Sequence, residues 1–361
     1  MHQRIASGLP RLKETRYTIK NSRIDWRYLW ERYVSRELLT ADDVKGAWAI
    51  VPTPAKQGAS DWRATNTVDV DETARMVDGL IKAGVDGILS MGTLGEAATM
   101  TYDEKLVFMQ TLVDTAAGRV PVFVGTTCIN TRDTVALTRK AVDIGATGTM
   151  LGIPMWCAPS VDVAVQFYKD VSEAVPDINV AIYANPEAFK FDFPRNFWAQ
   201  VAEIPQVVTA KYIGVATLLP DLAAIKGRIK LLPIDFDYYG AARMDDSINA
   251  FWTSGAVCHP LVSTTLRDLV AQARESGDWS QAKAFMGRLG PTAATLFPNG
   301  SFKEFSTYNI ALEKARMTAG GWMDAGPCRP PYHLCPEPYL EGARKSGRMW
   351  AELGKALENE A

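Results

Sequence analysis

The residue with the clearest chemical potential in this chain is Lys211, which lies at the end of the apolar run Gln206-Val207-Val208-Thr209-Ala210-Lys211-Tyr212. A lysine in such a place is either solvated at the rim of a sheet or held in a pocket that excludes water. In a pocket, burial disfavours the ammonium form, the pKa falls, and the neutral amine becomes a nucleophile toward ketones. Because a solvated strand-end lysine is the more common case, the functional interpretation needs support from other residues.

Two further segments supply that support. Gly92-Thr93-Leu94-Gly95-Glu96 follows the apolar segment 87–90, and its glycines allow successive backbone N–H groups to converge on an anion, for which we expect a carboxylate. Tyr183 ends another apolar strand, just before Asn185-Pro186. A strand-end tyrosine can also be a core residue, and Glu96 can be a favourable charge near a helix N-terminus. An anion-binding loop, a phenol and a lysine together predict a site for a 2-oxo acid.

The elements that must position these residues are short apolar strands, which alternate with helical segments from Gly46 onward. Continuous apolar runs of this length are typical of parallel strands covered on both faces. Glycines mark the ends of two intervening helices, at Gly84 and Gly145. Eight strands joined by helices predict an α/β fold, a (β/α)8 TIM barrel, whose active site lies at the C-terminal ends of the strands. The predicted strands are 47–52, 87–90, 120–125, 148–152, 179–183, 207–212, 229–234 and 250–257.

The composition narrows the class of protein. The chain has 361 residues, of which 47% are hydrophobic and 22% charged, and its formal net charge is −2. These values are typical of a soluble enzyme with ample core, and they disfavour nucleic acid or a membrane as the main partner. The five cysteines include no Cys-x-x-Cys pair, which favours reduced thiols in the cytoplasm. No apolar run reaches membrane-spanning length.

Three regions are predicted along the chain. Residues 1–40 form a basic arm with nine Arg/Lys against four Asp/Glu, which we expect to be poorly ordered or to dock elsewhere, with RNA binding as the less favoured alternative. Residues 41–260 form the barrel core. Residues 261–361 form a C-terminal helical region that completes and covers the barrel, with a turn at 326–332 before the last helix.

From about Leu38 to its end, the chain resembles the pyruvate-dependent class I aldolases related to dihydrodipicolinate synthase and N-acetylneuraminate lyase. The Gly-Thr-x-Gly-Glu segment, Tyr183 and Lys211 occur in the order and spacing of that family. The strings at 181–194, 208–212 and 326–332 resemble a subgroup, the hydratase-aldolases that cleave ortho-substituted benzylidenepyruvates in aromatic-hydrocarbon breakdown. Leu94 replaces a threonine of the synthases, and 187–189 lacks their arginine, so an apolar mouth suited to an aryl group is expected.

The resemblance implies a carbon–carbon lyase that requires no cofactor and no metal, acts on an aromatic 2-oxo acid and pyruvate, and forms a homotetramer. Lys211 would form the Schiff base and Tyr183 would transfer protons. The residues expected to bind the substrate are Gly92, Thr93, Leu94, Trp252, Gly255 and Asn309. Trp252 can equally be a packing aromatic, and Asn309 a helix-surface amide or cap.

Several alternatives remain open. Another aldolase or synthase of the same superfamily would share the barrel, and so would a noncatalytic sensor of 2-oxo acids, although a sensor needs neither Lys211 nor Tyr183. A metal-dependent aldolase needs convergent ligands, and Cys328, His333 and Cys335 only loosely suggest a zinc site. The ortho group of the substrate is either a hydroxyl or a carboxylate, and we slightly favour the carboxylate.

Overall fold

Eight short parallel strands form the centre of the molecule in the computed structural model, which describes residues 38–360. Each strand pairs with the one before it in the sequence, and β8 pairs with β1. The ring is completed between β7 and β8, where Ile234 bridges Trp252 and the Trp252 N–H donates to the Pro233 carbonyl at 2.9 Å. The predicted TIM barrel is confirmed. The strands are β1 (Gly46–Ile50), β2 (Gly87–Leu89), β3 (Val122–Gly125), β4 (Gly148–Leu151), β5 (Asn179–Tyr183), β6 (Val207–Lys211), β7 (Lys230–Leu232) and β8 (Ala250–Thr253).

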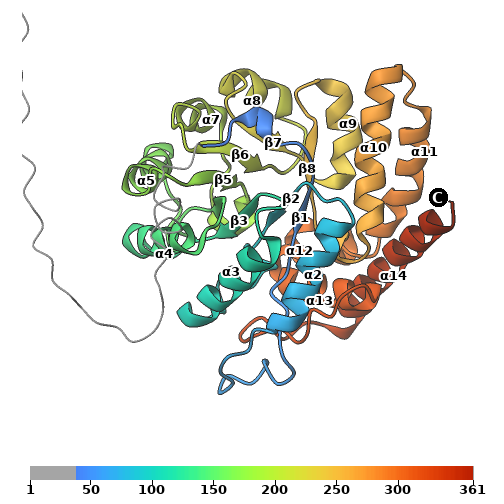
Figure 1. Ribbon diagram of the computed structural model, residues 1–361, viewed down its shortest axis with the longest axis horizontal. Coiled ribbons are helices and arrows are strands. Elements are labelled where there is room, and N and C mark those ends of the chain that lie inside the picture. Colours follow the sequence, from blue (N-terminus) through green and yellow to red (C-terminus); the bar gives the residue numbers. More distant parts are fainter. Residues whose placement is uncertain (1–37, 361) are drawn as a thin grey trace, which may run out of the picture. The chain divides into compact units, whose positions relative to one another are not determined.

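Helices follow the strands and surround the barrel (Figure 1). The elements up to the eighth strand are η1 (Ala41–Asp43), α2 (Val70–Lys82), α3 (Tyr102–Ala116), α4 (Thr131–Ile144), α5 (Val161–Ala174), α6 (Pro186–Phe189), α7 (Arg195–Val201), α8 (Leu218–Ile225) and α9 (Asp235–Met244). Those after it are η2 (Gly255–Val257), α10 (Pro260–Ser276), α11 (Ser280–Leu289), η3 (Gly290–Ala293), η4 (Pro298–Gly300), α12 (Phe302–Thr307), α13 (Asn309–Gly320) and α14 (Glu337–Glu360).

The helix boundaries follow from local chemistry. Thr101 and Glu104 form a reciprocal capping box at the start of α3, and the Asn130 side chain accepts the Asp133 N–H at the start of α4. Gly84 and Gly145 have φ values of 87° and 102°, which only glycine adopts without strain, and each ends its helix as predicted. These caps place the following strands β2 and β4 directly after the turn.

Large and small residues alternate between neighbouring strands of the core. The fully buried Trp48 ring meets Phe123 edge to face, with ring centroids 5.5 Å apart. A Cβ on Gly87 would lie 2.5 Å from the Trp48 ring, and one on Gly148 would lie 2.3 Å from the Phe123 ring. Glycine is therefore required at both strand starts because the aromatic rings occupy the space of a side chain.

The C-terminal helices pack on the barrel and on one another. Helix α10 contacts α9 and β1, and α14 lies along α13 and α10 (Figure 1). A Cβ on Gly347 of α14 would lie 1.9 Å from the Arg316 carbonyl of α13, so glycine permits this close approach. The buried Trp350 of α14 donates its Nε1–H to the His259 carbonyl at 3.1 Å.

Two sequence-based expectations need comment. The predicted eighth strand, 250–257, ends at Thr253, and Gly255–Val257 instead form η2. A Cβ on Gly255 would lie 2.3 Å from the Trp350 ring, so this turn packs against α14 too closely for any residue but glycine. The predicted basic arm, residues 1–40, lies outside the described residues except for its last three positions.

Candidate active site

Lys211 is the last residue of β6, and it is buried with 5% of its surface exposed. Its Nζ lies 3.4 Å from the centroid of the Trp252 ring and 4.8 Å from that of Tyr183. Desolvation lowers the pKa of Lys211 from 10.5 to about 7, while the Glu313 carboxylate acts in the opposite direction. A large fraction of this amine is therefore neutral near pH 7 and able to attack a carbonyl carbon.

Tyr183 lies next to Lys211 because the two residues are register partners at the ends of the neighbouring strands β5 and β6. The Tyr183 hydroxyl is 2.9 Å from Thr93 Oγ1 and accepts a hydrogen bond from Asn185 Nδ2 at 3.1 Å. Phe189 packs edge to face on the ring and fixes its plane. The phenol is thus oriented, and the Thr93 hydroxyl gives it a partner for proton exchange.

The loop after β2, which the sequence predicted to bind an anion, contains backbone N–H groups that are not used within the loop. In the described part of the chain, the N–H groups of Thr93 and Leu94 have no acceptor, whereas those of Glu96 and Ala97 bond to carbonyls within the loop. A Cβ on Gly95 would lie 2.7 Å from the Met91 nitrogen, so the loop tightens only with glycine there. Two free N–H groups beside Lys211 and Tyr183 are a suitable receptor for a carboxylate.

Glu96, by contrast, does not act as a simple charge at a helix N-terminus, and that alternative is wrong. Helix α3 begins at Tyr102, six residues after Glu96. The Glu96 carboxylate is fully buried and contacts Lys314 Nζ at 2.8 Å, and it also contacts the Arg329 guanidinium and accepts the Arg329 N–H at 2.7 Å. It therefore ties the anion loop to α13 and to the turn before α14.

An inner chamber of about 70 Å³ surrounds the Lys211 amine. Gly92, Thr93 and Leu94 form one wall, and Tyr183 and Trp252 form another. A Cβ on Gly92 would lie 3.2 Å from the Tyr183 ring, which explains why this wall begins with glycine. Since a water molecule takes about 30 Å³ of liquid volume, the chamber suits a ligand portion of only a few heavy atoms.

A larger cavity of about 560 Å³ adjoins the chamber. The two share seven lining residues, which mark the passage between them: Gly92, Thr93, Tyr183, Asn185, Phe302, Phe305 and Asn309. The outer walls are mainly apolar and include Ile129, Met155 and Ala188, with the charged residues Lys105, Asp133 and Glu187 also present. A small chamber that holds a lysine and a tyrosine, and that opens into a much larger cavity, fits a 2-oxo acid with a bulky flat substituent.

The three other predicted substrate contacts differ in their placement. Trp252 lines the chamber directly beside Lys211, and its Nε1–H donates to the Tyr212 carbonyl at 2.9 Å. Asn309 opens α13 at the passage, and its buried Oδ1 has no partner among the described residues. Gly255 is not among the residues that line either cavity, because it faces Trp350.

Sequence reasoning missed four polar residues of the chamber: Asn185, Ser254, Glu313 and Arg316. Glu313 and Arg316 are four and seven positions after Asn309, so they share its face of α13. Charged residues at this spacing in a helix usually indicate a solvated face, and α13 is instead buried between the barrel and α14. Only the tertiary structure identifies them.

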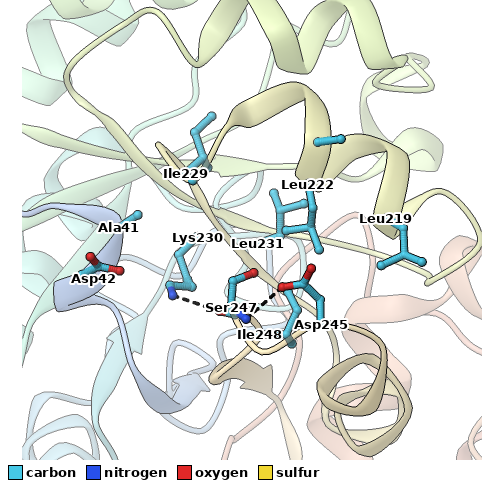
Figure 2. Close-up of a pocket in the computed structure, with 12 residues that line it drawn as sticks. Ala41, Asp42, Leu219, Leu222, Ile229, Lys230, Leu231, Asp245, Ser247 and Ile248 are labelled. Atoms are coloured by element: carbon cyan, nitrogen blue, oxygen red, sulfur yellow. Dashed lines mark hydrogen bonds between the residues drawn. The ribbon is translucent and has the colours of Figure 1, made fainter.

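A separate cavity of about 360 Å³ lies at the opposite end of the barrel (Figure 2). Lys230, the first residue of β7, donates from Nζ to the Ser247 carbonyl at 3.0 Å, and the Ser247 N–H donates to Asp245 at 2.9 Å. Because catalytic groups of this fold collect at the C-terminal ends of the strands, the Lys211 chamber is the candidate site.

Residues 38–360 contain no helix long and apolar enough to cross a membrane. In the same residues, no three His, Cys, Asp or Glu side chains gather in a way that could hold a metal ion. Cys328, which we considered for zinc, is mostly buried near Lys314 and Glu96, and burial raises the pKa of its thiol to about 11.

Comparisons with known proteins agree with the barrel fold described above. Residues 59–343 match the dihydrodipicolinate synthetase family, and the chain belongs to that family. By structure it is similar to PhdJ bound to substrate intermediate, with a TM-score of 0.86 and 40% identity over 88% of this chain and 98% of that one. A dihydrodipicolinate synthase from Acinetobacter baumannii, at 22% identity and a TM-score of 0.69, shares the fold over 85% of this chain and 99% of its own.

Curated relatives narrow the class further. The chain is 84% identical to the trans-O-hydroxybenzylidenepyruvate hydratase-aldolase of Sphingobium xenophagum over 327 residues, which are 91% of this chain and all of that protein. It is 39% identical to the trans-2'-carboxybenzalpyruvate hydratase-aldolase of Nocardioides sp. (strain KP7), over 87% of this chain and 95% of that protein.

Proposed function

We propose that this chain is a hydratase-aldolase, a carbon–carbon lyase that cleaves trans-o-hydroxybenzylidenepyruvate to the ortho-hydroxy aromatic aldehyde and pyruvate. The observation that carries the proposal is that the chamber around Lys211 opens into a larger outer cavity, because this matches a pyruvate end joined to an aryl end. The relative at 84% identity favours an ortho hydroxyl over the carboxylate that the sequence had slightly favoured.

Lys211 acts as the nucleophile. Its neutral amine attacks the C2 ketone, water leaves, and a protonated Schiff base forms. The iminium withdraws electrons through the conjugated double bond, so water adds its oxygen to the benzylic carbon and a proton to C3. When the new hydroxyl loses its proton, the C3–C4 bond breaks and its electron pair moves into the iminium to give an enamine. Protonation at C3 and hydrolysis then release pyruvate.

Tyr183 is the proton carrier in this scheme. Its hydroxyl can receive the proton of the benzylic alcohol and return it through the Thr93 hydroxyl, 2.9 Å away. The free N–H groups of Thr93 and Leu94 hold the carboxylate of the substrate, with Gly92 giving close access. These contacts involve the pyruvate half, so they serve both the enone and the aldol.

The aryl half occupies the outer cavity. Phe302 and Phe305 border the passage, and Trp252 covers the iminium side. Asn309, with an unpartnered Oδ1 at the passage, hydrogen-bonds the hydrating water or the new hydroxyl. Gly255 takes no part in binding in this proposal, since it does not reach either cavity.

Two finer expectations from the resemblance also belong to the proposal: a homotetramer and a cytoplasmic location. The five free cysteines of the chain support a reducing compartment. Sedimentation of the purified protein measures the oligomeric state, and a monomer at micromolar concentration would contradict the tetramer.

The test combines trapping with turnover. Borohydride reduction in the presence of pyruvate should add mass to the protein at Lys211, and the Lys211→Ala variant should lose both the label and all cleavage of the enone. Tyr183→Phe should still be labelled, but should turn over about 10²–10⁴-fold more slowly because the proton carrier is gone.

Exposed Lys190 provides the control, since Lys190→Ala should keep both properties. Label on another lysine would refute the assignment of Lys211. Labelling with pyruvate but no cleavage of any benzylidenepyruvate would point to another aldolase of the superfamily. Absence of label and turnover would favour a noncatalytic sensor.

A further inference from the structure

A closed hydrogen-bond network lies beneath the inner chamber and has no role in the scheme above. The Ser254 hydroxyl donates to Glu313 Oε1 at 2.9 Å. Arg316 Nη1 donates to Ser254 Oγ at 3.1 Å and to Glu313 Oε2 at 3.3 Å. All three side chains line the chamber that holds Lys211, and their exposed fractions are 4%, 4% and 1%.

These contacts fix the position of the Glu313 side chain, because both of its oxygens accept hydrogen bonds and one contacts a guanidinium. Arg316 is fixed in turn by the Trp350 ring, 5.1 Å from its guanidinium carbon. Its Nε and Nη2 groups have no hydrogen-bond acceptor among the described residues. The network is therefore buried and fixed by its contacts, and its charged residues Glu313 and Arg316 line the chamber.

The charges around Lys211 come from several elements. Helix α13 supplies Glu313 and Arg316, and α9 supplies Asp235, whose carboxylate accepts the Thr253 hydroxyl at 2.6 Å. Cys258, the residue after η2, adds no charge near neutral pH, because burial raises the pKa of its thiol to about 12. Burial raises the pKa of the Asp235 carboxyl to about 6, and its charged neighbours are Arg316 and Glu313. Glu313 is the charge that acts on Lys211 itself.

We infer that the Glu313 carboxylate, held by Ser254 and Arg316, is the counter-charge for the cationic Schiff base formed on Lys211. The inference rests on the proposed function and deepens it. Glu313 is a positioning residue, because no hydrogen bond joins it to the lysine and it acts through space. It stabilises the positive charge that develops when the neutral amine becomes an iminium.

The physical reason is that the chamber offers the iminium little solvent. A cation in a site of low dielectric constant is costly unless an opposite charge lies nearby, and the attraction is stronger there than in water. Because the network already fixes Glu313 in the free enzyme, little reorganisation is needed when the charge appears. The desolvated amine stays nucleophilic while its cationic product is stabilised.

The experiment measures Lys211 in two ways in the full-length protein. Competitive labelling with an amine-reactive acetylating reagent, followed by mass spectrometry, gives the pH midpoint of the Lys211 amine without any substrate. Borohydride trapping at a fixed, subsaturating pyruvate concentration gives the fraction present as Schiff base. Glu313→Gln should lower the labelling midpoint by about one pH unit, the lower end of the shift that an opposite charge produces. It should also reduce the trapped fraction at subsaturating pyruvate about tenfold.

Glu313→Asp keeps the charge on a shorter side chain, so its midpoint should lie between those of the wild type and Glu313→Gln. Glu104→Gln is the matched control, because Glu104 is also buried and hydrogen-bonded but lies on α3, outside both cavities. It should lower thermal stability and leave the Lys211 midpoint unchanged. If Glu313→Gln does not fold, the test rests on Glu313→Asp. A Lys211 labelling midpoint in Glu313→Asp that is equal to or above the wild-type value then overturns the inference.

Two failures are distinguishable. Normal trapping in the wild type, with the same midpoint and trapped fraction in Glu313→Gln, overturns the inference alone. No pyruvate-dependent trapping in the wild type overturns the proposed function, and the counter-charge role with it. A fallen midpoint together with reduced trapping supports the inference, since general loosening of the fold would hydrate the amine and raise its midpoint.

Discussion

At the scale of the residue, the amine of Lys211 is maintained at a cost in stability. An unfolded lysine has a pKa near 10.5, and burial lowers the pKa in the folded protein to about 7. Between these pH values the unfolded chain binds a proton that the native protein does not, so the stability of the native protein rises as pH increases from about 7 toward 10.5. Below pH 7 the full cost of burying the ammonium applies.

Lys211→Met should therefore be more stable than the wild type at pH 6. Methionine has a similar length and no charge to desolvate, so the gain is up to about 5 kcal/mol, the free-energy equivalent of the shift in pKa. Urea unfolding at several pH values measures it, and the gain should shrink between pH 7 and 10. Lys169→Met, on the exposed face of α5, should show no such trend. A Lys211→Met variant that is less stable at pH 6 would contradict the account.

The sequence predicted the candidate residues on strands better than those on helices. Lys211 and Tyr183 were identifiable because each ends an apolar run and because the Gly92 loop provides a third strand end with matching chemistry. Glu313 and Arg316 were not, since a charged residue in a helix is normally solvated, and only the packing of α14 makes their face of α13 an interior one. Whether these residues carry the chemistry stays a prediction.

At the scale of the element, the anion loop depends on a distant part of the chain. Glu96, which has a positive φ of 58°, is held by Lys314 of α13 and by Arg329 of the following turn. Arg329 Nε also donates to Thr67 Oγ1 at 2.7 Å, which joins the segment before α2 to the same cluster. Three segments far apart in sequence thus meet behind the loop that begins at Gly92.

Glu96→Gln should destabilise the protein by about 3–5 kcal/mol, because it leaves two buried cations without their anion. Thermal unfolding measures the loss, and the Michaelis constant for the substrate should rise since the loop loses its support. The exposed ion pair of Asp61 and Arg63 offers a contrast, and Asp61→Asn should change neither value measurably. Equal stability of Glu96→Gln and wild type would show that the cluster is dispensable.

The predicted strands and helix ends agree with the structure because local rules determine them. Apolar runs of strand length and the glycines at 84 and 145 carry their own signals. The eighth strand was extended too far, since 254–257 is as apolar as a strand. It turns into η2 because Gly255 fits under Trp350, which is a long-range contact that no local pattern reveals.

At the scale of the whole molecule, α14 supports the site without reaching it. Trp350 is fully buried, packs edge to face on Phe236 with ring centroids 6.1 Å apart, and lies under Arg316. Phe236 and Arg316 both line the inner chamber. The last helix therefore contacts two lining residues of the candidate site through the Trp350 side chain.

Trp350→Ala should cost about 3–5 kcal/mol, the usual range for removing a large buried aromatic side chain. It should also slow turnover, because Arg316 and Glu313 lose their fixed positions. Calorimetry and steady-state kinetics measure the two effects. Trp156→Ala is the matched control, since 81% of that side chain is exposed and its removal should leave the melting temperature unchanged. A similar melting temperature in both variants would contradict a supporting role for α14.

The same long-range packing explains why the sequence predicted a C-terminal region that covers the barrel but not how it contributes. Composition and turn signals indicate helices after residue 261, yet they carry no information on which face of each helix meets the strands. Contacts such as Gly347 against the Arg316 carbonyl depend on two helices docking at close range. They become visible only once the chain is folded.

The candidate site is divided between two stretches of the gene. In the proposed scheme, Thr93, Leu94, Tyr183 and Lys211 contact the pyruvate half of the substrate, whereas helix α12 lies at the passage to the aryl half. Mutation in the codons for residues 302–307, which exclude Asn309, can therefore alter which aldehyde is released, while the codons for the shared chemistry stay under separate selection. Such a division gives a lineage a short route to new growth substrates without rebuilding its catalyst.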